Sequence, residues 1–432
     1  MTLAHEFDDR REPQFEAPQA TNDAARQAAT LLPRISIQAF CETRDVFGAL
    51  EEARADRRTS RAQMSVQMGG IGAAVDLYAD SPTPNIVILE TSATGDRLMQ
   101  DLAALADVCE AETEVIIIGH ANDIMLYRQL LSRGVSEYLV APIGPVDAIA
   151  AMCRLYAQEG EDHAGRSVAV IGAKGGVGAS TVAHNFAWSL SQDMMKNVAI
   201  ADLDLPFGTA GLDFNQDPSQ GIADAIFAGD RLDESLIDKL LWKCTDRLSL
   251  FAAPATLERD YDIDFESVEP VIDLLRGLVP QLVLDMPHQW NAWTRQTLMA
   301  ADDIVIVAAP DLGNLRNAKN LVDLLAQHRR NDREPFLVLN QIGIPKRPEI
   351  SPQEFAGALN LDIAAEIAFE PQIFGMAANN GQMISETQAN AKAADAFRTL
   401  ARAVVGQSDA PRGANSLIAQ LMDRLKLSKA GK

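Results

Sequence analysis

Short apolar runs separated by segments of helical spacing recur through the first half of the chain. Segments such as Val46–Ala53 have the spacing of a helix, and the apolar runs are Ile35–Phe40, Met64–Val66, Asn85–Glu90, Val115–Ile118 and Tyr138–Val140. Runs of this length between helices are typical of buried strands in βαβ units. Five such strands predict a parallel sheet covered on both faces, in the flavodoxin-like manner.

A second series of apolar runs predicts another α/β domain with a mostly parallel sheet. Its strands are Ser167–Ile171, Asn197–Ala201, Gln281–Leu284, Asp303–Ala309 and Pro335–Leu339. After the first of these, apolar residues recur at helical spacing from Ser180 onward. The short polar, glycine-bearing stretch between the two series predicts a linker. The predicted domains are therefore residues 33–157 and 166–405, with a linker at 158–165.

The two ends of the chain have a different composition. Residues 1–32 are polar, contain Pro13 and Pro18, and predict a disordered segment. In residues 406–432, apolar side chains share one helical face and basic ones lie nearby: Leu417, Ile418, Leu421, Met422 and Leu425, with Arg424, Lys426, Lys429 and Lys432. Such an amphipathic helix fits an anionic membrane surface, a partner's groove, its own domain or a dimer mate, and the sequence leaves these alternatives open.

Composition narrows the class of protein. The chain has 432 residues, of which 47% are hydrophobic and 23% charged, as in ordinary soluble globular proteins. A formal net charge of -22 argues against nucleic acid as a partner, because that affinity depends on Lys and Arg meeting phosphates. The cysteines are far apart and form no C-x-x-C pair, which favours a reduced, cytoplasmic setting: Cys41, Cys109, Cys153 and Cys244. No apolar run approaches the roughly 18 residues of a membrane span.

A glycine-rich loop, Gly172–Thr181, joins the first strand of the second domain to its helix. Closely spaced glycines let successive backbone N–H groups surround an anion at a helix N-terminus, so the loop predicts a phosphate site. The expected binding residues are Gly175, Gly176, Val177, Gly178, Ala179, Ser180 and Thr181. An ordinary P-loop ends Gly-Lys-Ser/Thr, with the hydroxyl on magnesium. Here Ala179 replaces that lysine, Ser180 keeps the hydroxyl, and Lys174 lies at the start.

Carboxylates follow two later strands of the same domain. Asp202 and Asp204 come directly after one strand, and Asp285 ends another. The carboxyl ends of strands in an open α/β sheet face the ligand crevice. We therefore expect Asp285, with the Ser180 hydroxyl, on the Mg²⁺ side of the site. The alternative, two merely solvated carboxylates at 202 and 204, is disfavoured by their position after the loop.

The segment Lys174-Gly-Gly-Val-Gly resembles the deviant Walker A motif of the MinD/ParA family, and the resemblance extends over about Arg166–Val405. It implies a homodimer around ATP and Mg²⁺, with Lys174 reaching into the partner's site. By the same resemblance Asp204 positions the attacking water and Asp202 supports the metal environment. Since Ala179 removes one cation that would balance the triphosphate, we expect slow or absent hydrolysis.

The resemblance also implies residues on the base side of the nucleotide. Asn340, an amide at the end of a strand, resembles the residue that hydrogen-bonds the adenine edge, since an amide offers both a donor and an acceptor. Phe369 and Glu370 resemble contacts from the family's base-side loop.

The first domain resembles the receiver domain of two-component systems, chiefly in Gly134–Pro142. The receiver chemistry is missing: Glu90 stands in place of the phosphoacceptor Asp, Ala141 in place of the Lys, and His120 or Gly119 at the Thr/Ser position. We therefore expect no phosphorylation and a docking or dimerisation role. Glu90 could imitate a phosphorylated aspartate, although a solvated strand-end carboxylate is the favoured interpretation.

A degenerate receiver before such a domain, together with Lys-Gly-Gly-Val-Gly-Ala-Ser-Thr, resembles the CpaE/TadZ family of Tad (Flp) pilus assembly proteins. That resemblance implies a factor that places the pilus secretion machinery, often at a cell pole, and a nucleotide-linked scaffold more than a turnover enzyme. The alternative is a MinD-like ATPase switch that cycles on the inner membrane surface. Nitrogenase-reductase-like electron transfer is disfavoured because Cys244 has no glycine-flanked setting, and a tyrosine-kinase role because the C-terminus has no tyrosine cluster.

Overall fold

The computed structural model describes residues 31–156, 165–258 and 260–406. Contacts divide the chain into two compact units between Gln158 and Glu159. The division falls within the predicted linker, which lies almost wholly outside the described residues, as do the predicted N-terminal segment and amphipathic tail. Within the described ranges no helix is both long and apolar enough to cross a membrane.

The first unit contains a five-stranded, all-parallel sheet in the order β2-β1-β3-β4-β5. Its strands are β1 (Ser36–Cys41), β2 (Gln63–Met68), β3 (Ile86–Thr91), β4 (Glu114–Gly119) and β5 (Glu137–Val140). This is the flavodoxin-like order, so the predicted arrangement is confirmed. β3 is buried along its whole length, as expected for a strand covered on both faces.

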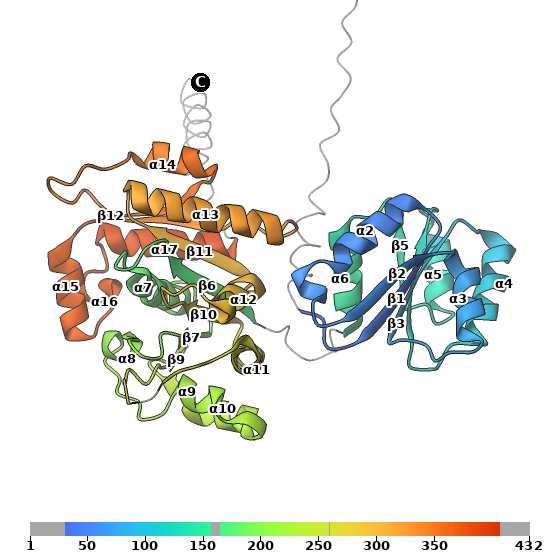
Figure 1. Ribbon diagram of the computed structural model, residues 1–432, viewed down its shortest axis with the longest axis horizontal. Helices are drawn as coiled ribbons and strands as arrows, with labels where there is room; N and C mark the ends of the chain where they lie inside the picture. Colours follow the sequence, from blue (N-terminus) through green and yellow to red (C-terminus); the bar gives the residue numbers. More distant parts are fainter. Residues whose placement is uncertain (1–30, 157–164, 259, 407–432) are drawn as a thin grey trace, which may run out of the picture. The chain divides into compact units, whose positions relative to one another are not determined.

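Helices cover both faces of this first sheet (Figure 1). They are α2 (Arg44–Arg54), the 3₁₀ turn η1 (Arg57–Thr59), α3 (Gly70–Tyr78), α4 (Gly95–Ala106), α5 (Ile124–Leu131) and α6 (Pro145–Tyr156). α2 and α6 pack on one face through residues such as Leu50 and Ile149. α3, α4 and α5 pack on the other through residues such as Ile71, Leu98 and Leu130. The unit therefore has its own core.

The second unit contains an eight-stranded sheet in the order β13-β12-β11-β6-β10-β7-β9-β8. Its strands are β6 (Arg166–Gly172), β7 (Val198–Asp202), β8 (Trp242–Lys243), β9 (Leu248–Phe251), β10 (Gln281–Asp285), β11 (Asp303–Ala308), β12 (Phe336–Ile342) and β13 (Ile363–Ala368). Only the β8–β9 pair is antiparallel among the described strands. The predicted mostly parallel sheet is confirmed, and β6, the strand before the glycine loop, lies near its centre.

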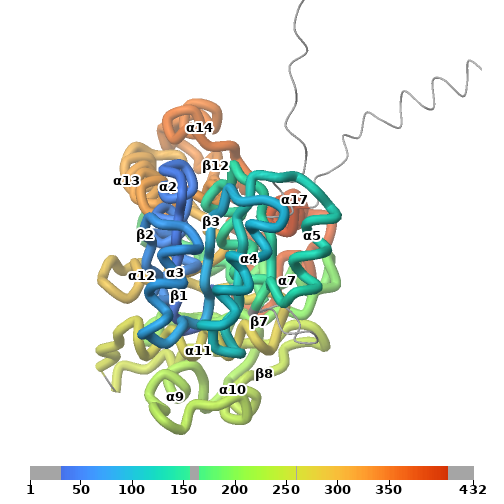
Figure 2. The backbone as a smooth tube through the Cα atoms, turned by 90° about the vertical axis from the view of Figure 1, so that its right-hand side faces the viewer, coloured from blue at the N-terminus to red at the C-terminus, as the bar shows by residue number. Residues whose placement is uncertain are grey.

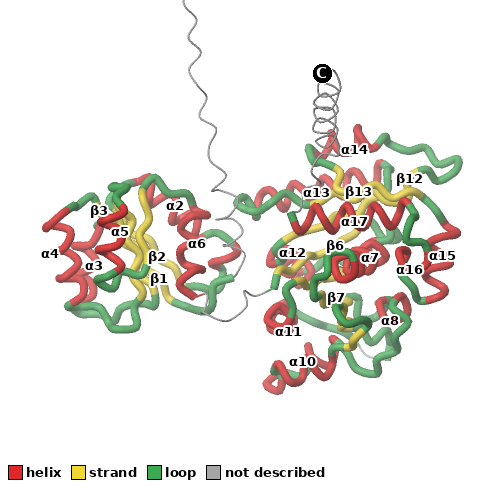
Figure 3. Tube along the Cα trace, turned by 180° about the vertical axis from the view of Figure 1, so that it is seen from behind, coloured by secondary structure: helices red, strands yellow, loops and turns green. Residues whose placement is uncertain are grey.

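Helices also cover both faces of the second sheet, as Figure 3 shows from behind. They are α7 (Ala179–Gln192), α8 (Ala210–Asp213), α9 (Ile222–Ile226), η2 (Gly229–Arg231), α10 (Glu234–Leu240), α11 (Phe265–Leu278), α12 (Ala292–Ala300), α13 (Leu312–His328), α14 (Pro352–Leu359), α15 (Pro371–Asn380), α16 (Ile384–Thr387) and α17 (Lys392–Val405). α7 and α17 pack on one face, and α11 to α14 on the other. The short helices α9 and α10 pack on each other (Figure 2).

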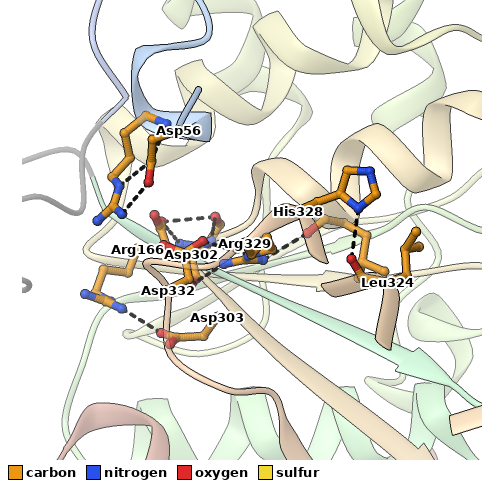
Figure 4. A network of polar contacts seen from close by, with 11 residues as sticks. Asp56, Arg166, Asp302, Asp303, Leu324, His328, Arg329 and Asp332 are labelled. Atoms are coloured by element: carbon orange, nitrogen blue, oxygen red, sulfur yellow. Dashed lines mark hydrogen bonds and ion pairs between the residues drawn. The ribbon is translucent and has the colours of Figure 1, made fainter. Parts of the chain in front are cut away.

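A buried polar network fixes the amino-terminal end of β6 (Figure 4). The Asp302 carboxylate accepts hydrogen bonds from the Ser167 N–H at 2.9 Å and its hydroxyl at 3.1 Å, and pairs with Arg276 at 2.9 Å. Arg329 donates to the Asp302 carbonyl oxygen at 2.9 Å and pairs with Asp332 at 2.8 Å. Because buried charges are costly without partners, this network holds β6 in one position relative to α11 and α13.

Candidate nucleotide-binding site

The glycine loop bends tightly between the end of β6 and the start of α7. Gly176 and Gly178 have φ angles of +78° and +81°, a region that L-residues with a side chain rarely adopt. A Cβ at position 178 would also lie 2.7 Å from the Asn340 side-chain nitrogen. Gly178 is the N-cap of α7, so the loop leads directly into the positive end of a helix. The predicted strand, loop and helix are all present.

Side-chain amides hold the loop in place. Asn340 Nδ2 donates to the Val177 carbonyl oxygen at 2.8 Å, and Gln341 Nε2 donates to that of Gly176 at 2.9 Å. From α13, Asn317 Nδ2 donates to the Ala173 carbonyl oxygen at 2.9 Å. Asn340 Oδ1 also accepts from the Gln341 N–H at 2.8 Å. Asn340 thus supports the loop in this structure, and its predicted contact with an adenine edge stays a prediction.

The acidic residues expected around Mg²⁺ come together at the carboxyl ends of β7 and β10. Asp202 and Asp285 are direct cross-strand neighbours, and both are buried. Asp202 accepts hydrogen bonds from the N–H groups of Asp204 and Ala210, each at 3.1 Å. Burial and then the charge of Asp285 raise the pKa of the Asp202 carboxyl group. Burial likewise raises the pKa of Asp204.

Several of these carboxylate oxygens lack a hydrogen-bond donor among the described residues. These atoms are Oδ1 and Oδ2 of Asp285 and Oδ1 of Asp204, and all three are buried. Apart from the ion pair between Asp285 and His184, these buried oxygens have no partner among the described residues, so this position fits a cation or its bound water. The described part of the chain holds no group of three or more His, Cys, Asp or Glu that could bind a metal ion by themselves. Ser180, half-buried in the first turn of α7, would have to complete such a site together with phosphate oxygens.

A histidine at this site was not among the residues predicted from the sequence. His184, fully buried on α7, lies 2.7 Å through Nδ1 from Asp213 and 3.3 Å through Nε2 from Asp285. Burial alone would lower its pKa, but the two carboxylates raise it to about 10. The imidazolium therefore places a fixed positive charge behind the loop. The one available signal was a titratable residue within 182–187 of the predicted helix, a run that is otherwise apolar except for Asn185.

The other predicted site residues lie around the loop. Lys174 is exposed beside Asp311, the N-cap of α13. Burial by itself raises the pKa of Asp311. Hydrogen bonds from Asn314 and the charge of Lys174 outweigh burial, so the pKa lies below its ordinary value. Phe369 is exposed directly after β13. Glu370 is the N-cap residue of α15, and its Oε2 is buried without a hydrogen-bond partner among the described residues.

The first unit carries its own buried carboxylate at the end of β3. Glu90 is completely buried and accepts hydrogen bonds from the N–H groups of Glu42 and Thr43 at 2.7 and 2.8 Å, and from the Thr43 hydroxyl at 2.7 Å. His120 Nε2 lies 3.1 Å from Glu90 Oε1, the oxygen that also accepts from the Thr43 hydroxyl. The favoured interpretation of a solvated carboxylate is therefore wrong. Adjacent β3 and β1 bring Glu90 under the N-terminus of α2, where backbone donors satisfy it.

Fold and loop together define the class of the second unit, a P-loop NTPase of the MinD/ParA type. The chain is 27% identical to a ParA family ATPase from Chlorobium tepidum, whose crystal structure matches with a TM-score of 0.50. The match covers 55% of this chain and 98% of that one. The septum site-determining protein MinD of Synechocystis is 26% identical over 273 residues, which cover 60% of this chain and 98% of that protein. No protein-family model matches the chain.

A third comparison identifies the family. The crystal structure of a pilus assembly protein CpaE from Caulobacter crescentus is 48% identical, covers 30% of this chain and 98% of its own, and has a TM-score of 0.29. Identity of this level along nearly the whole of that protein's chain is evidence from sequence, independent of the superposition. The chain belongs to the CpaE-type pilus assembly proteins.

Proposed function

We propose that this protein is a nucleotide-linked assembly and localisation factor for Tad/Flp pilus secretion components, which dimerises around ATP and Mg²⁺ with slow or absent hydrolysis. The observation that carries the proposal is a preformed phosphate loop in which Ala179 occupies the place of the usual lysine. Such a loop retains the backbone donors for phosphate but has lost a cation from the same subunit. In this proposal the protein acts on the cytoplasmic side, at the inner membrane or a cell pole.

Each site residue has a distinct task in this proposal. The loop N–H groups and the α7 N-terminus bind phosphate oxygens, and the Ser180 hydroxyl and Asp285 orient the metal. Mg²⁺, when bound, would neutralise charge on the terminal phosphates. Asp202 holds the turn after β7 through its two backbone hydrogen bonds. His184 orients Asp285 through the ion pair at its Nε2.

Exposed apolar side chains support dimerisation through the face that carries the loop. They lie after the carboxyl ends of strands, where the loop also lies: Phe207, Leu212, Trp290, Leu312, Phe369 and Met376. Large apolar side chains gathered on one face are typical of protein interfaces. The exposed Lys174 lies on the same edge of the sheet, as a lysine that reaches a second subunit must.

The test is ATP binding by calorimetry together with the mass of the protein in solution, with and without Mg²⁺-ATP. Lys174→Ala should lower ATP affinity about tenfold and abolish the ATP-dependent dimer, because a charge-assisted phosphate contact is lost. Lys239→Ala, at an exposed position of α10, is the matched control. Unchanged binding and dimerisation in Lys174→Ala would refute the role of Lys174 across the dimer.

One observation favours the alternative, an active MinD-like switch on the inner membrane surface. Asp204 keeps a buried oxygen without a donor among the described residues, as a carboxylate that positions an attacking water requires. Measurable ATP turnover that rises with anionic vesicles and is lost in Asp204→Asn would favour this alternative over the scaffold.

We further propose that the first unit is an atypical receiver-like docking or dimerisation module. Its flavodoxin-like strand order and the position of Glu90 at the end of β3 support this proposal. Hydrogen bonds engage both carboxylate oxygens of Glu90, so this side chain is not open to a phosphoryl group. The share of the chain that the Caulobacter protein covers is close to the share taken by residues 31–156.

A further inference from the structure

A groove of about 770 Å³ opens in the second unit, and Asp204, one of the acidic residues of the candidate nucleotide site, lines it. Leu203 and Leu205 from the turn after β7 and Trp293 from α12 give it an apolar lining. Asp204, Pro287 and Gln289, from the turns after β7 and β10, also line it. The groove therefore borders the candidate nucleotide site but does not include the loop itself.

The segment before α11 gives this groove an acidic rim. In Asp260–Phe265, carboxylates alternate with Tyr261, Ile263 and Phe265. The three apolar side chains are half-buried and pack against the core, whereas the three carboxylates are exposed. Within the described residues, Asp260 and Asp262 form no ion pair. The groove thus presents an apolar floor under a row of carboxylates, of which Asp260 and Asp262 have no ion-pair partner in the part of the chain that the structure describes.

We propose that this groove binds the protein's own C-terminal segment, residues 414–432, in the same molecule. That segment carries four basic side chains and one acidic one within an acidic protein, and its apolar residues recur at helical spacing. An amphipathic segment of this kind buries its apolar face in a groove and places its basic residues against the rim. Charge and apolar pattern are both complementary to the groove.

The length of the connecting chain sets how far the segment can reach. The described residues end at Gly406, the C-cap of α17. Residues 407–416 can extend to about 33 Å. A domain of this size has a radius of gyration of about 18 Å, which corresponds to a diameter of about 46 Å for a compact sphere, so the extended connection spans about two thirds of the unit. Since Asp204 and Pro287 line the groove, a docked segment would contact the turns that follow β7 and β10. The docking itself requires no nucleotide.

Photo-cross-linking in the purified full-length protein, without nucleotide, tests this proposal. A p-benzoylphenylalanine at Leu257, a groove-lining residue that is 71% exposed, should cross-link to a peptide within residues 414–432 in a product of monomer mass. The same probe at Leu278, 40% exposed at the end of α11 and outside the groove lining, should not. A product of dimer mass, a cross-link to another segment, or none at Leu257 would overturn the proposal.

A charge variant tests the acidic rim in the same assay. Asp260→Asn with Asp262→Asn should lower the cross-link yield at Leu257 about tenfold, because the attraction for the basic segment is reduced. Asp230→Asn with Asp238→Asn, at exposed positions outside the groove, is the matched control and should leave the yield unchanged. Circular dichroism checks that both variants are folded. An unchanged yield in the rim variant would overturn the electrostatic part of the proposal.

Discussion

Gly178 shows how a single residue fixes the candidate site, because both its backbone conformation and its contact exclude a side chain. Gly178→Ala should destabilise the protein by about 2 kcal/mol, from the left-handed φ and the close approach to Asn340. It should also abolish nucleotide binding, since the loop can no longer close. Chemical unfolding and calorimetry measure the two effects.

The control for Gly178→Ala is Gly277→Ala, in α11. A Cβ there meets nothing within 4 Å, and alanine stabilises a helix by about 1 kcal/mol relative to glycine. A Gly178→Ala protein as stable as the wild type would show that the loop does not need its left-handed turn.

His184 makes the stability of the protein depend on pH. The folded-state pKa of His184, about 10, lies above the unfolded value of 6.5. The contribution of His184 to the free energy of unfolding is therefore complete below pH 6.5 and is lost as pH rises through 10. His184→Asn should therefore lower the free energy of unfolding at pH 7 by about 1–3 kcal/mol. The difference from wild type should shrink toward pH 10 in urea titrations. A stability difference between His184→Asn and wild type that is independent of pH would mean that the His184 ring is neutral.

At the scale of elements, Glu90 joins β3 to the first turn of α2. Glu90→Gln replaces one acceptor oxygen by an NH₂ donor that faces other N–H or O–H donors. The substitution should therefore lower the free energy of unfolding by about 2–3 kcal/mol. Glu52→Gln, at an exposed position of α2, should change stability by less than about 0.5 kcal/mol. Equal stability of the two variants in chemical unfolding would contradict the account of Glu90 as a buried acceptor.

The elements that the sequence predicts well are parallel strands buried on both faces. β3, β4, β6, β10 and β11 appear as uninterrupted apolar runs, and their predicted bounds differ from the observed ones by a residue or two. β8 has only two residues, both exposed, so no apolar run marks it. Burial of Glu90 escaped prediction because it depends on donors about 48 residues away in sequence. The pairing of Asp202 with Asp285 follows from strand order, whereas the contact between His184 and Asp285 depends on the rotation of α7 over the sheet.

The whole molecule has two units with separate hydrophobic cores, and its unfolding should reflect them. Residues of the first unit form two clusters with each other, and those of the second unit form two more. We therefore expect two transitions in calorimetric unfolding, since single domains unfold cooperatively and separate cores need not. Glu90→Gln should lower only the transition of the first unit.

Nucleotide should act on the other transition. At a Mg²⁺-ATP concentration of about 100 times the dissociation constant, binding to the folded second unit adds about 2.7 kcal/mol to its stability and raises its transition alone. Gly178→Ala should remove this shift while the first unit's transition keeps its temperature. A single transition that moves with both Glu90→Gln and nucleotide would instead mean that the units fold as one, and that a change at the loop alters the stability of the first unit.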